Sequence, residues 1–436
     1  MSGMTISIIA ILAMLGLMAL RVPIAIALGS VSLVGLIVIR GPHAALGIFG
    51  DLPIEFGASW SLSAIPMFLL MGSIAFHSGL TASLFDAARL WLSGLPGGLA
   101  VATNFASAGF AAASGSSLAT SAAMSRLAIP EMLRAKYNPA LASGCVAASG
   151  TLGALIPPSI MFVIYGWYTQ TSIGLLLIAG ILPGLLTAAI YAGMIIFLCV
   201  VRPDYAPPVE YKITWAERFR VLLTVWPIPL LVLCIAGSIF SGIATATEAA
   251  ALGALFAAII AALRGSLTWE ILRKSVVEAL VSTASIFFIA ISALLITRFF
   301  AFAGLPAALA QHVGVLGLDP LTIVLGVSVL YLILGAFLDP MGVLLLSLPV
   351  IFPIFKAAGI DMIWMGVLLV KYLEIGMLTP PVGLNVYVVK GVVGNLIPLP
   401  TIFRGVMWFL GAEVIIMALL IAFPGISTYL PYNFMQ

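Results

Sequence analysis

The chain has 436 residues, of which 63% are hydrophobic and 8% charged, with a formal net charge of +3. A soluble globular protein is excluded, because a chain of this length would need far more polar surface to cover its core. Strands of a membrane barrel alternate in polarity, and the apolar runs of this sequence do not. The sequence therefore predicts an all-α polytopic membrane protein. Residues 1–20 lack a basic leader and a cleavage site, so we expect a retained span there rather than a signal peptide.

Apolar stretches of spanning length make up much of the chain. Those typical of plain membrane helices lie at about residues 5–20, 22–39, 60–77, 173–200, 221–240, 243–263, 277–299 and 405–423. The segment Arg21–Pro23 interrupts the first two, which form either two tight spans or one bent segment. Cys145, Cys199 and Cys234 are isolated in sequence, so we expect them to pack as small hydrophobic residues and not to form disulfides or a metal site.

Further stretches are apolar but interrupted near their centres. Residues 97–128 and 320–355 carry Gly, Ser and Pro at their middles, which is typical of a hairpin that enters the membrane and returns. Residues 140–170 and 363–393 are longer and carry a Pro-Pro pair near the centre, which is typical of a broken helix. The sequence thus predicts two re-entrant helical hairpins and two broken transmembrane helices.

These interrupted stretches occur as two similar units. The segment Gly153–Pro158 resembles Gly376–Pro381, which lies 223 positions later. At the same offset, Ser116 of the first hairpin aligns in sequence with Asp339 of the second. The chain is therefore predicted to contain one unit twice, each copy with a span, a hairpin and a broken helix.

The positive charges predict how the two units are oriented. Under the positive-inside rule, the first hairpin opens to the cytoplasm and the second to the outside. Threading the other spans accordingly places 14 of the 18 Lys and Arg residues inside, and leaves Arg40, Arg298, Lys356 and Lys371 at or near the outer face. The repeats are then inverted, which is the architecture of secondary transporters.

This threading also divides the chain into parts with different expected roles. We expect scaffold helices in residues 1–59, a first repeat in 60–172 and further scaffold helices with a cytoplasmic loop in 173–276. A second, inverted repeat follows in 277–395, and residues 396–436 form a C-terminal scaffold helix. Each repeat is predicted to supply an arm and half of a transport domain.

The centre of the first hairpin is rich in small hydroxyl residues, from Ser114 through Gly115 and Ser116 to Thr120. Irregular backbone at membrane depth is tolerated only where protein or a water-filled cavity satisfies its polar groups. Its carbonyls and hydroxyls suit an alkali cation, and its helix N-termini suit a carboxylate. The alternative is that small residues only allow close helix packing. The mirrored second copy favours the binding role.

The second hairpin and both broken helices carry the other candidates. Asp339 lies inside an apolar stretch, where a carboxylate is costly and usually functional, although it could instead only cap a helix before Pro340. Consecutive prolines remove amide donors and leave carbonyls without partners, either as a plain kink or as part of a binding site. Thr379 lies where its hydroxyl could join an ion shell, and Asn385 can both donate to and accept from a substrate.

Two isolated charges have plainer interpretations. Glu248 in its apolar span is expected to make a scaffold contact rather than to line a subunit seam. Arg298 at a span end is expected to snorkel to the interface rather than to attract an anion. The sequence contains no His-Glu-x-x-His zinc motif and no phosphate-binding Walker motif, so a zinc protease and an ATP motor are not supported.

Several motifs together resemble the large membrane subunit of TRAP (tripartite ATP-independent periplasmic) transporters, DctM type, over essentially the whole chain. They are Ser114–Thr120, Gly153–Ser159, Gly242–Ala250, Gly335–Asp339 and Leu378–Asn385. One departure is Ala246, where the family pattern leads us to expect a proline between the two threonines. It concerns only the local shape of that span.

The resemblance implies an elevator transporter, in which a transport domain slides against a fixed scaffold in the bacterial inner membrane. Sodium ions would drive uptake of a C4-dicarboxylate, sialic acid or a similar carboxylate, with no other cofactor. The implied partners are a periplasmic substrate-binding protein and a small four-helix membrane subunit, with no nucleic acid. The chain itself would not be an enzyme.

The candidate residues follow the hairpin tips and the helix breaks. The predicted sodium ligands are Ser114, Gly115, Ser116, Thr151, Ser159, Gly335, Asp339, Thr379 and Gly383. The residues predicted nearer the substrate are Ser117, Thr120, Pro157, Pro380 and Asn385.

Two other functions stay open at this point. The first is a stand-alone sodium symporter for a dicarboxylate or citrate, against which the TRAP-like motifs argue. The second is an intramembrane hydrolase using Ser116 or Asp339, which lacks a suitably placed histidine or second catalytic aspartate.

Overall fold

The computed structural model describes residues 3–207, 214–316 and 319–434, so the predicted inner-side Lys212 lies outside the described residues. Every regular element in the described ranges is a helix. In this part of the chain, seven helices are long and apolar enough to cross a membrane, or up to eight if one bent pair counts as a single span. The predicted all-α polytopic class is confirmed.

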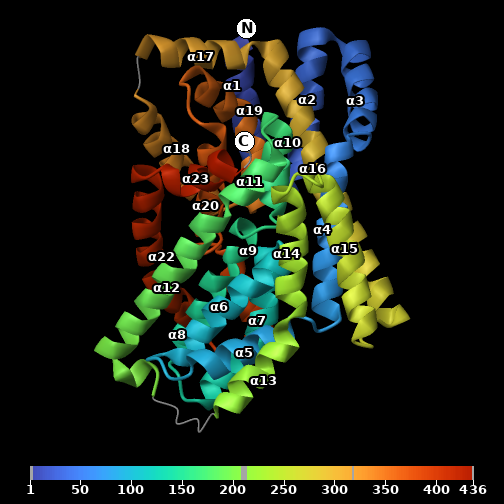
Figure 1. Cartoon of the computed structure of the whole chain (residues 1–436). Coiled ribbons are helices and arrows are strands. Elements are labelled where there is room, and N and C mark those ends of the chain that lie inside the picture. The colour runs from blue at the N-terminus through green and yellow to red at the C-terminus, as the bar shows by residue number, and fades with distance from the viewer. Residues whose placement is uncertain (1–2, 208–213, 317–318, 435–436) are drawn as a thin grey trace.

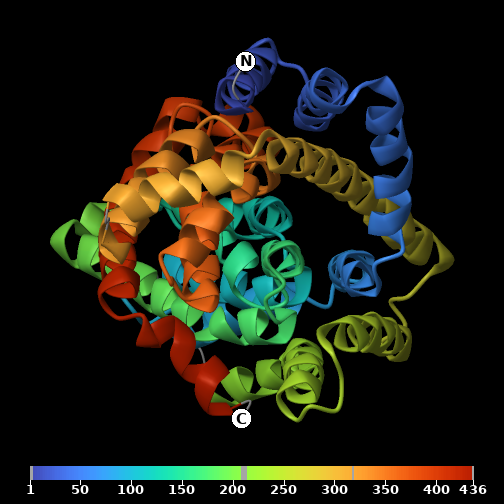
Figure 2. The ribbon, with the colours of Figure 1, turned by 90° about the horizontal axis from the view of Figure 1, so that it is seen from above.

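The first part of the chain forms an outer layer of helices, together with three helices from the middle of the chain. Its members are α1 (Gly3–Ala19), α2 (Ile24–Arg40), α3 (Pro42–Gly57), η1 (Trp60–Ser63), α4 (Ala64–His77), α14 (Pro227–Phe240), α15 (Ala246–Leu263) and α16 (Trp269–Ala303). Figure 2 shows these helices as an arc along one side of the molecule. Residues 5–39 form two separate helices, α1 and α2, that pack against each other.

Helix breaks occur at the places predicted for the two hairpins and the two broken helices. The first hairpin is α6 (Gly98–Ser114) and α7 (Ser117–Arg134), and the second is α18 (Pro320–Gly335) and α19 (Pro340–Ala357). The first broken helix is α8 (Pro139–Gly150), α9 (Leu152–Leu155) and α10 (Ile160–Thr169), and the second is α20 (Met362–Gly376) and α21 (Leu384–Val393). Figure 1 places the first hairpin in the lower half of the molecule and the second in the upper half.

Two long helices pack directly against the broken helices. They are α12 (Ile181–Val201), which follows α11 (Ile173–Ala179), and α22 (Leu399–Ala422), which precedes α23 (Gly425–Phe434). Helix α22 lies along α8 and also contacts α12, α20 and α21. The rings of Tyr191 and Phe409 meet edge to face between α12 and α22, with centroids 5.1 Å apart. These two helices therefore share one packed body with the broken helices.

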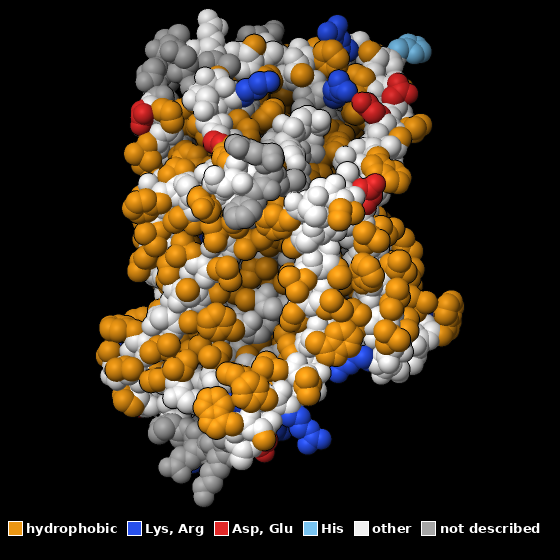
Figure 3. All heavy atoms as spheres, in the orientation of Figure 1, with side chains coloured by type: hydrophobic (Ala, Val, Ile, Leu, Met, Phe, Trp, Pro, Cys, Tyr) orange, Lys and Arg blue, Asp and Glu red, His pale blue; other side chains and the backbone are white. Residues whose placement is uncertain are grey.

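Shorter helices connect these bodies. They are α5 (Ala82–Leu92), η2 (Pro203–Tyr205), α13 (Trp215–Val225), α17 (Leu305–Leu316) and η3 (Gly394–Leu396). Helix α13 is bent by 48° from α14 and packs on α5, where the Trp91 indole donates to the Arg218 carbonyl at 3.1 Å. Figure 3 shows apolar side chains over the middle of one face, with Lys and Arg gathered towards its two ends. This distribution is that of a protein embedded in a bilayer.

The isolated polar residues take simple positions. Glu248 is exposed and completes a capping box with Thr245 at the start of α15. Arg298 is half exposed and lies 3.7 Å from the Glu55 carboxylate of α3. Ala246 occupies the first helical position of α15, which accepts alanine or proline without a change of shape.

Candidate functional site

The tip of the first hairpin is held by its own hydroxyls. Gly115 has φ +61°, a left-handed conformation that favours glycine, and lets α6 turn directly into α7. The Ser116 hydroxyl accepts from the Ala119 N–H at 3.3 Å and caps α7. The Thr120 hydroxyl donates to the Ser116 carbonyl at 2.8 Å and lies 3.1 Å from the Ser114 hydroxyl. The predicted residues of this tip therefore lie together.

This tip packs on the break of the first broken helix with almost no space between the two backbones. A Cβ atom on Gly115 would lie 2.5 Å from the Pro158 carbonyl oxygen, and one on Gly153 would lie 2.7 Å from the Ser116 carbonyl. The Ser117 hydroxyl donates to the Thr151 carbonyl at 3.3 Å. Glycine is required at both positions because only it allows this approach.

The second hairpin tip repeats this arrangement. The Asp339 carboxylate accepts from the Gly342 N–H at 2.9 Å and caps α19. The Val382 N–H, from the break of the second broken helix, donates to the Ala336 carbonyl at 3.3 Å. A Cβ atom on Gly376 would lie 2.7 Å from the backbone of Gly335. Each hairpin tip is thus seated on the break of its own broken helix.

Other predicted residues lie away from the tips, or their hydroxyls donate to nearby backbone carbonyls of the same segment. Pro157 lines an apolar cavity of about 150 Å³ against α12 and α14. Pro380 is exposed, whereas Asn385 is fully buried and donates to the Ala147 carbonyl at 3.2 Å. The Ser159 hydroxyl donates to the Ala154 carbonyl, and the Thr379 hydroxyl donates to the Ile375 carbonyl at 2.7 Å. Gly383 has φ +57° and begins α21.

A polar cavity of about 260 Å³ lies between the first hairpin and helices α4 and α16. Ser114, Ser116 and Arg126 line it from the hairpin side. On the opposite wall, the Glu278 carboxylate accepts from the Ser73 hydroxyl at 2.6 Å and lies 2.7 Å from His77 Nε2. Arg126 was predicted only as an inner-side positive charge, and its place in this cavity could not be found without the fold.

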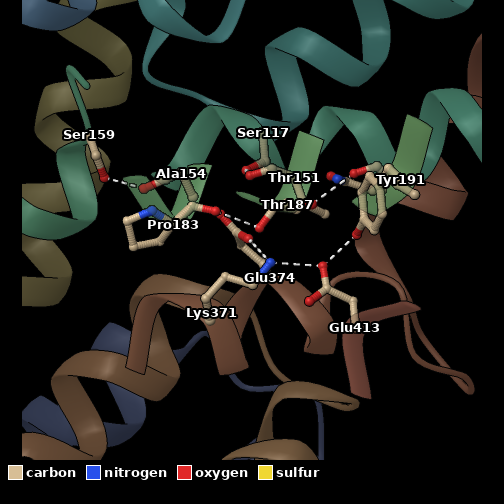
Figure 4. Close-up of polar contacts among 12 residues, drawn as sticks. Ser117, Thr151, Ala154, Ser159, Pro183, Thr187, Tyr191, Lys371, Glu374 and Glu413 are labelled. Carbon is tan, nitrogen blue, oxygen red and sulfur yellow. Dashed lines mark hydrogen bonds and ion pairs between the residues drawn. The ribbon is translucent and has the colours of Figure 1, made fainter. Parts of the chain in front are cut away.

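A buried cluster of charges joins α20 to α22. Lys371 Nζ donates to Glu374 Oε2 and to Glu413 Oε1, each at 2.8 Å, and all three side chains are at most 1% exposed. Figure 4 shows this cluster beside Ser117 and Thr151 of the first repeat. Lys371, predicted at or near the outer face, is buried and ion-paired within the protein. Intramembrane charges in residues 363–393 and 405–423 were the signal that could have found the cluster.

The hairpin tips present hydroxyl and carbonyl oxygen atoms of the described residues. Among the described residues, no group of three or more His, Cys, Asp or Glu could hold a metal ion. The tips instead offer hard oxygen atoms and helix N-termini, which suit sodium and carboxylates. Secondary transporters use such groups to bind their ions and substrates.

Comparisons with known proteins agree with this geometry. The sequence profile of the family described as "Tripartite ATP-independent periplasmic transporter, DctM component" matches residues 11–426. The C4-dicarboxylate TRAP transporter large permease protein DctM of Pseudomonas aeruginosa is 37% identical over 378 residues, covering 86% of this chain and 87% of that protein. The sialic acid TRAP transporter large permease protein SiaM of Vibrio cholerae is 34% identical over 431 residues, which are 97% of each chain.

A solved structure with a similar fold is the YdaH transporter of Alcanivorax borkumensis. Its TM-score is 0.60 at 14% identity, over 88% of this chain and 89% of that one. The resemblance predicted from the motifs is confirmed by the family match and the relatives. The chain therefore belongs to the DctM component family of tripartite ATP-independent periplasmic transporters, as a large permease subunit of the inner membrane and not an enzyme.

Proposed function

We propose that this permease takes up a small organic acid by a sodium-driven elevator mechanism. The single observation that carries the proposal is the pair of hairpin tips, each packed backbone to backbone on the break of its own broken helix. In secondary transporters, paired helix breaks of this kind bring non-helical backbone from two repeats together within the membrane. The upper and lower positions of the two hairpins support an inverted relation between the repeats.

Sodium would bind where hydroxyl and carbonyl oxygens gather at the tips. At the first tip these oxygens come from Ser114, Ser116 and Thr151, and at the second they come from Asp339 and Thr379. Oxygen is the ligand that hard cations prefer, and Asp339 adds the negative charge that one of the two sites needs. Sodium is cargo and driving ion here, so it is released at each cycle.

The organic acid would bind in the polar cavity beside the first tip. The Arg126 guanidinium lines this cavity and matches a carboxylate in charge and in shape. Ser114 and Ser116 provide neutral hydrogen-bonding groups on the same wall. Relatives are named for a C4-dicarboxylate and for sialic acid, which share the carboxylate that this arrangement recognises.

The moving body would contain both hairpins, both broken helices, α12 and α22. Helix α22 packs along α8, and Tyr191 of α12 donates to Glu413 of α22, so these helices form one unit. This assignment differs from the predicted boundaries, which placed residues 173–276 and 396–436 in the scaffold. The arc of α1–α4 and α14–α16 would form the fixed scaffold.

As the large permease of a tripartite transporter, the chain works with other components. We propose that these are a small four-helix membrane subunit on the scaffold and a periplasmic binding protein that delivers the acid. The deciding experiment reconstitutes the permease with its small subunit in liposomes and imposes a sodium gradient. Uptake of labelled succinate or sialic acid should require both the gradient and the cognate binding protein. Uptake without a binding protein would favour the stand-alone symporter instead.

A further inference from the structure

The charge cluster of Lys371, Glu374 and Glu413 takes no part in the proposed sodium or substrate sites. Two helices supply its charges, and the Tyr191 hydroxyl of α12 donates to Glu413 Oε1. With two carboxylates and one ammonium group, the cluster has a net charge of −1 when every member is ionised. One oxygen of each carboxylate, Glu374 Oε1 and Glu413 Oε2, is buried and has no hydrogen-bond partner.

No other charge among the described residues balances this cluster. The charged groups that act on Glu374 are Lys371 and Glu413. The tyrosines on helices packed against α20 bind elsewhere: Tyr165 to the Met362 carbonyl, Tyr331 to Ser347 and Tyr432 to Asp361. Tyr168 on α10 lies 3.1 Å from the Thr297 hydroxyl, and Lys356, Arg404 and Tyr429 on those helices are exposed. A buried, unbalanced negative charge is strongly unfavourable.

Among the described residues, the surroundings of Glu374 supply no cation besides Lys371. Figure 4 shows Ser117, Thr151 and Thr187 on the side of Glu374 that faces α9 and α12. Their hydroxyls donate to the carbonyls of Thr151, Ala148 and Pro183, which leaves their oxygen lone pairs as acceptors. Glu374 Oε1 has no hydrogen-bond partner, so a proton on Glu374 would remove a negative charge that no hydrogen bond to this oxygen stabilises.

We propose that this cluster is a proton-binding site, with one proton held on Glu374. A proton from water adds to the Glu374 carboxylate, and no bond breaks elsewhere. Glu374 is favoured over Glu413 because it accepts one hydrogen bond, whereas Glu413 accepts two, and each donated bond stabilises the ionised form. The proton brings the net charge of the cluster to zero. The site does not depend on the transport mechanism proposed above.

The position of the site connects it to the moving parts of the second repeat. Glu374 precedes Gly376 by two residues on α20, and Gly376 contacts the tip of the second hairpin at Gly335. Glu413 anchors the same helix to α22, and Tyr191 extends the contact to α12. Loss of the proton would therefore weaken the junction of three helices beside the second tip.

The number of protonated carboxyl groups in the purified full-length permease gives a direct test. Infrared difference spectra report the carbonyl band of a protonated carboxyl group, which shifts in heavy water. We expect Glu374→Gln and Glu413→Gln each to remove the band of one protonated carboxyl, because a single carboxylate balances Lys371. Lys371→Met should double the band intensity that the cluster contributes, because both glutamates must then be protonated for the cluster to be neutral. Lys371→Met combined with Glu413→Gln should restore the wild-type intensity, because only Glu374 then remains. The matched control, Glu131→Gln, removes a partly exposed carboxylate paired with Arg134 and should change nothing.

Two results would overturn the proposal. One is a carboxyl band that neither glutamine variant changes, while both variants keep the elution volume and unfolding temperature of the wild type. The other is a band that disappears when sodium is added at constant pH, because sodium would then balance the charge. The double variant keeps the test valid if Lys371→Met alone does not fold, since its cluster is neutral with one proton.

Discussion

At the scale of single residues, Asp339 caps a helix and is also the proposed sodium ligand of the second tip. Its carboxylate caps α19 through the Gly342 N–H, and it lies at the tip that contacts the second break. An asparagine would cap the helix nearly as well, because Asn and Asp are comparable N-cap residues. Only the aspartate carries a charge for sodium. The Asp339→Asn variant therefore tests the proposed sodium role while it keeps the helix cap.

We predict that Asp339→Ala and Asp339→Asn both abolish sodium-dependent uptake while the protein still inserts into the membrane. The alanine variant should also lose about 1 kcal/mol of stability with its cap, whereas the asparagine variant should not. Uptake in proteoliposomes and thermal unfolding in detergent measure the two effects. Asp319→Ala is the control, because Asp319 begins α18 without a side-chain cap. If Asp339→Asn keeps the sodium dependence of the wild type, Asp339 only caps the helix and does not bind sodium.

Arg126 gives a second prediction at this scale. A hydrogen bond to a charged group contributes about 1.5–3 kcal/mol, so Arg126→Gln should raise the KM for the organic acid by roughly tenfold to a hundredfold. The sodium dependence of the remaining uptake should stay unchanged, because Arg126 lies outside the proposed ion sites. The control is Arg134→Gln on the same helix, whose side chain is 77% exposed and paired with Glu131. An equal effect of both variants would point to general surface charge instead.

The sequence could identify the hairpin tips but not the buried charge cluster. Ser114–Ser116 and Asp339 were conspicuous because polar residues and glycine interrupted apolar stretches. The ion pairs of Lys371 were not predicted, because its positive charge was interpreted only as a topology signal. Its partner Glu413 lies 42 residues away on another helix, so the pair depends on tertiary packing. Pro157, although conspicuous in sequence, faces an apolar cavity.

At the scale of elements, each hairpin and its broken helix are joined through glycines. Gly376 of α20 meets Gly335 of α18 with no room for a side chain, and Gly153 meets Ser116 in the same way. Gly326, in the middle of α18, instead has open space around its Cβ position. The two kinds of glycine therefore differ in function although both lie in helices.

We predict that Gly376→Ala lowers the stability of the permease by about 1–3 kcal/mol and strongly reduces uptake, because the new methyl group separates tip and break. Gly326→Ala should be neutral or slightly stabilising, since alanine has a higher helix propensity. Thermal unfolding and sodium-driven uptake of the two variants give the comparison. If Gly376→Ala retains wild-type unfolding temperature and uptake, the close contact has no role in transport.

Hydropathy and breaker residues predicted most helices but not their grouping. The helix breaks within residues 97–128, 140–170, 320–355 and 363–393 were predicted correctly, because the residues that interrupt a helix act locally. Helices α3 and α17 were not predicted, since they are short and carry polar residues within their apolar pattern. The packing of α12 and α22 on the broken helices is set by contacts between distant segments, which a single sequence does not display.

At the scale of the whole molecule, few hydrogen bonds between described residues connect the two proposed bodies. Two of them come from α10: the Trp167 indole donates to the Ser59 hydroxyl at 3.1 Å, and the Tyr168 hydroxyl lies 3.1 Å from that of Thr297 on α16. Helix α23 packs on α12 and α20, so we assign it to the proposed moving body, and its Tyr432 donates to Asp361 at the start of α20 at 2.5 Å. An elevator movement must break the first two contacts and preserve the third.

This difference allows a test of the movement with paired cysteines. In a variant whose native Cys145, Cys199 and Cys234 are replaced by serine, a cleavable thiol crosslinker between Tyr168→Cys and Thr297→Cys should abolish uptake, because it ties the two bodies together. Reductive cleavage should restore it. The matched pair, Asp361→Cys with Tyr432→Cys, lies within one body, so its crosslink should leave uptake nearly unchanged. Full transport by the permease crosslinked at Tyr168→Cys and Thr297→Cys would contradict an elevator, since the substrate would then cross without relative movement of α10 and α16.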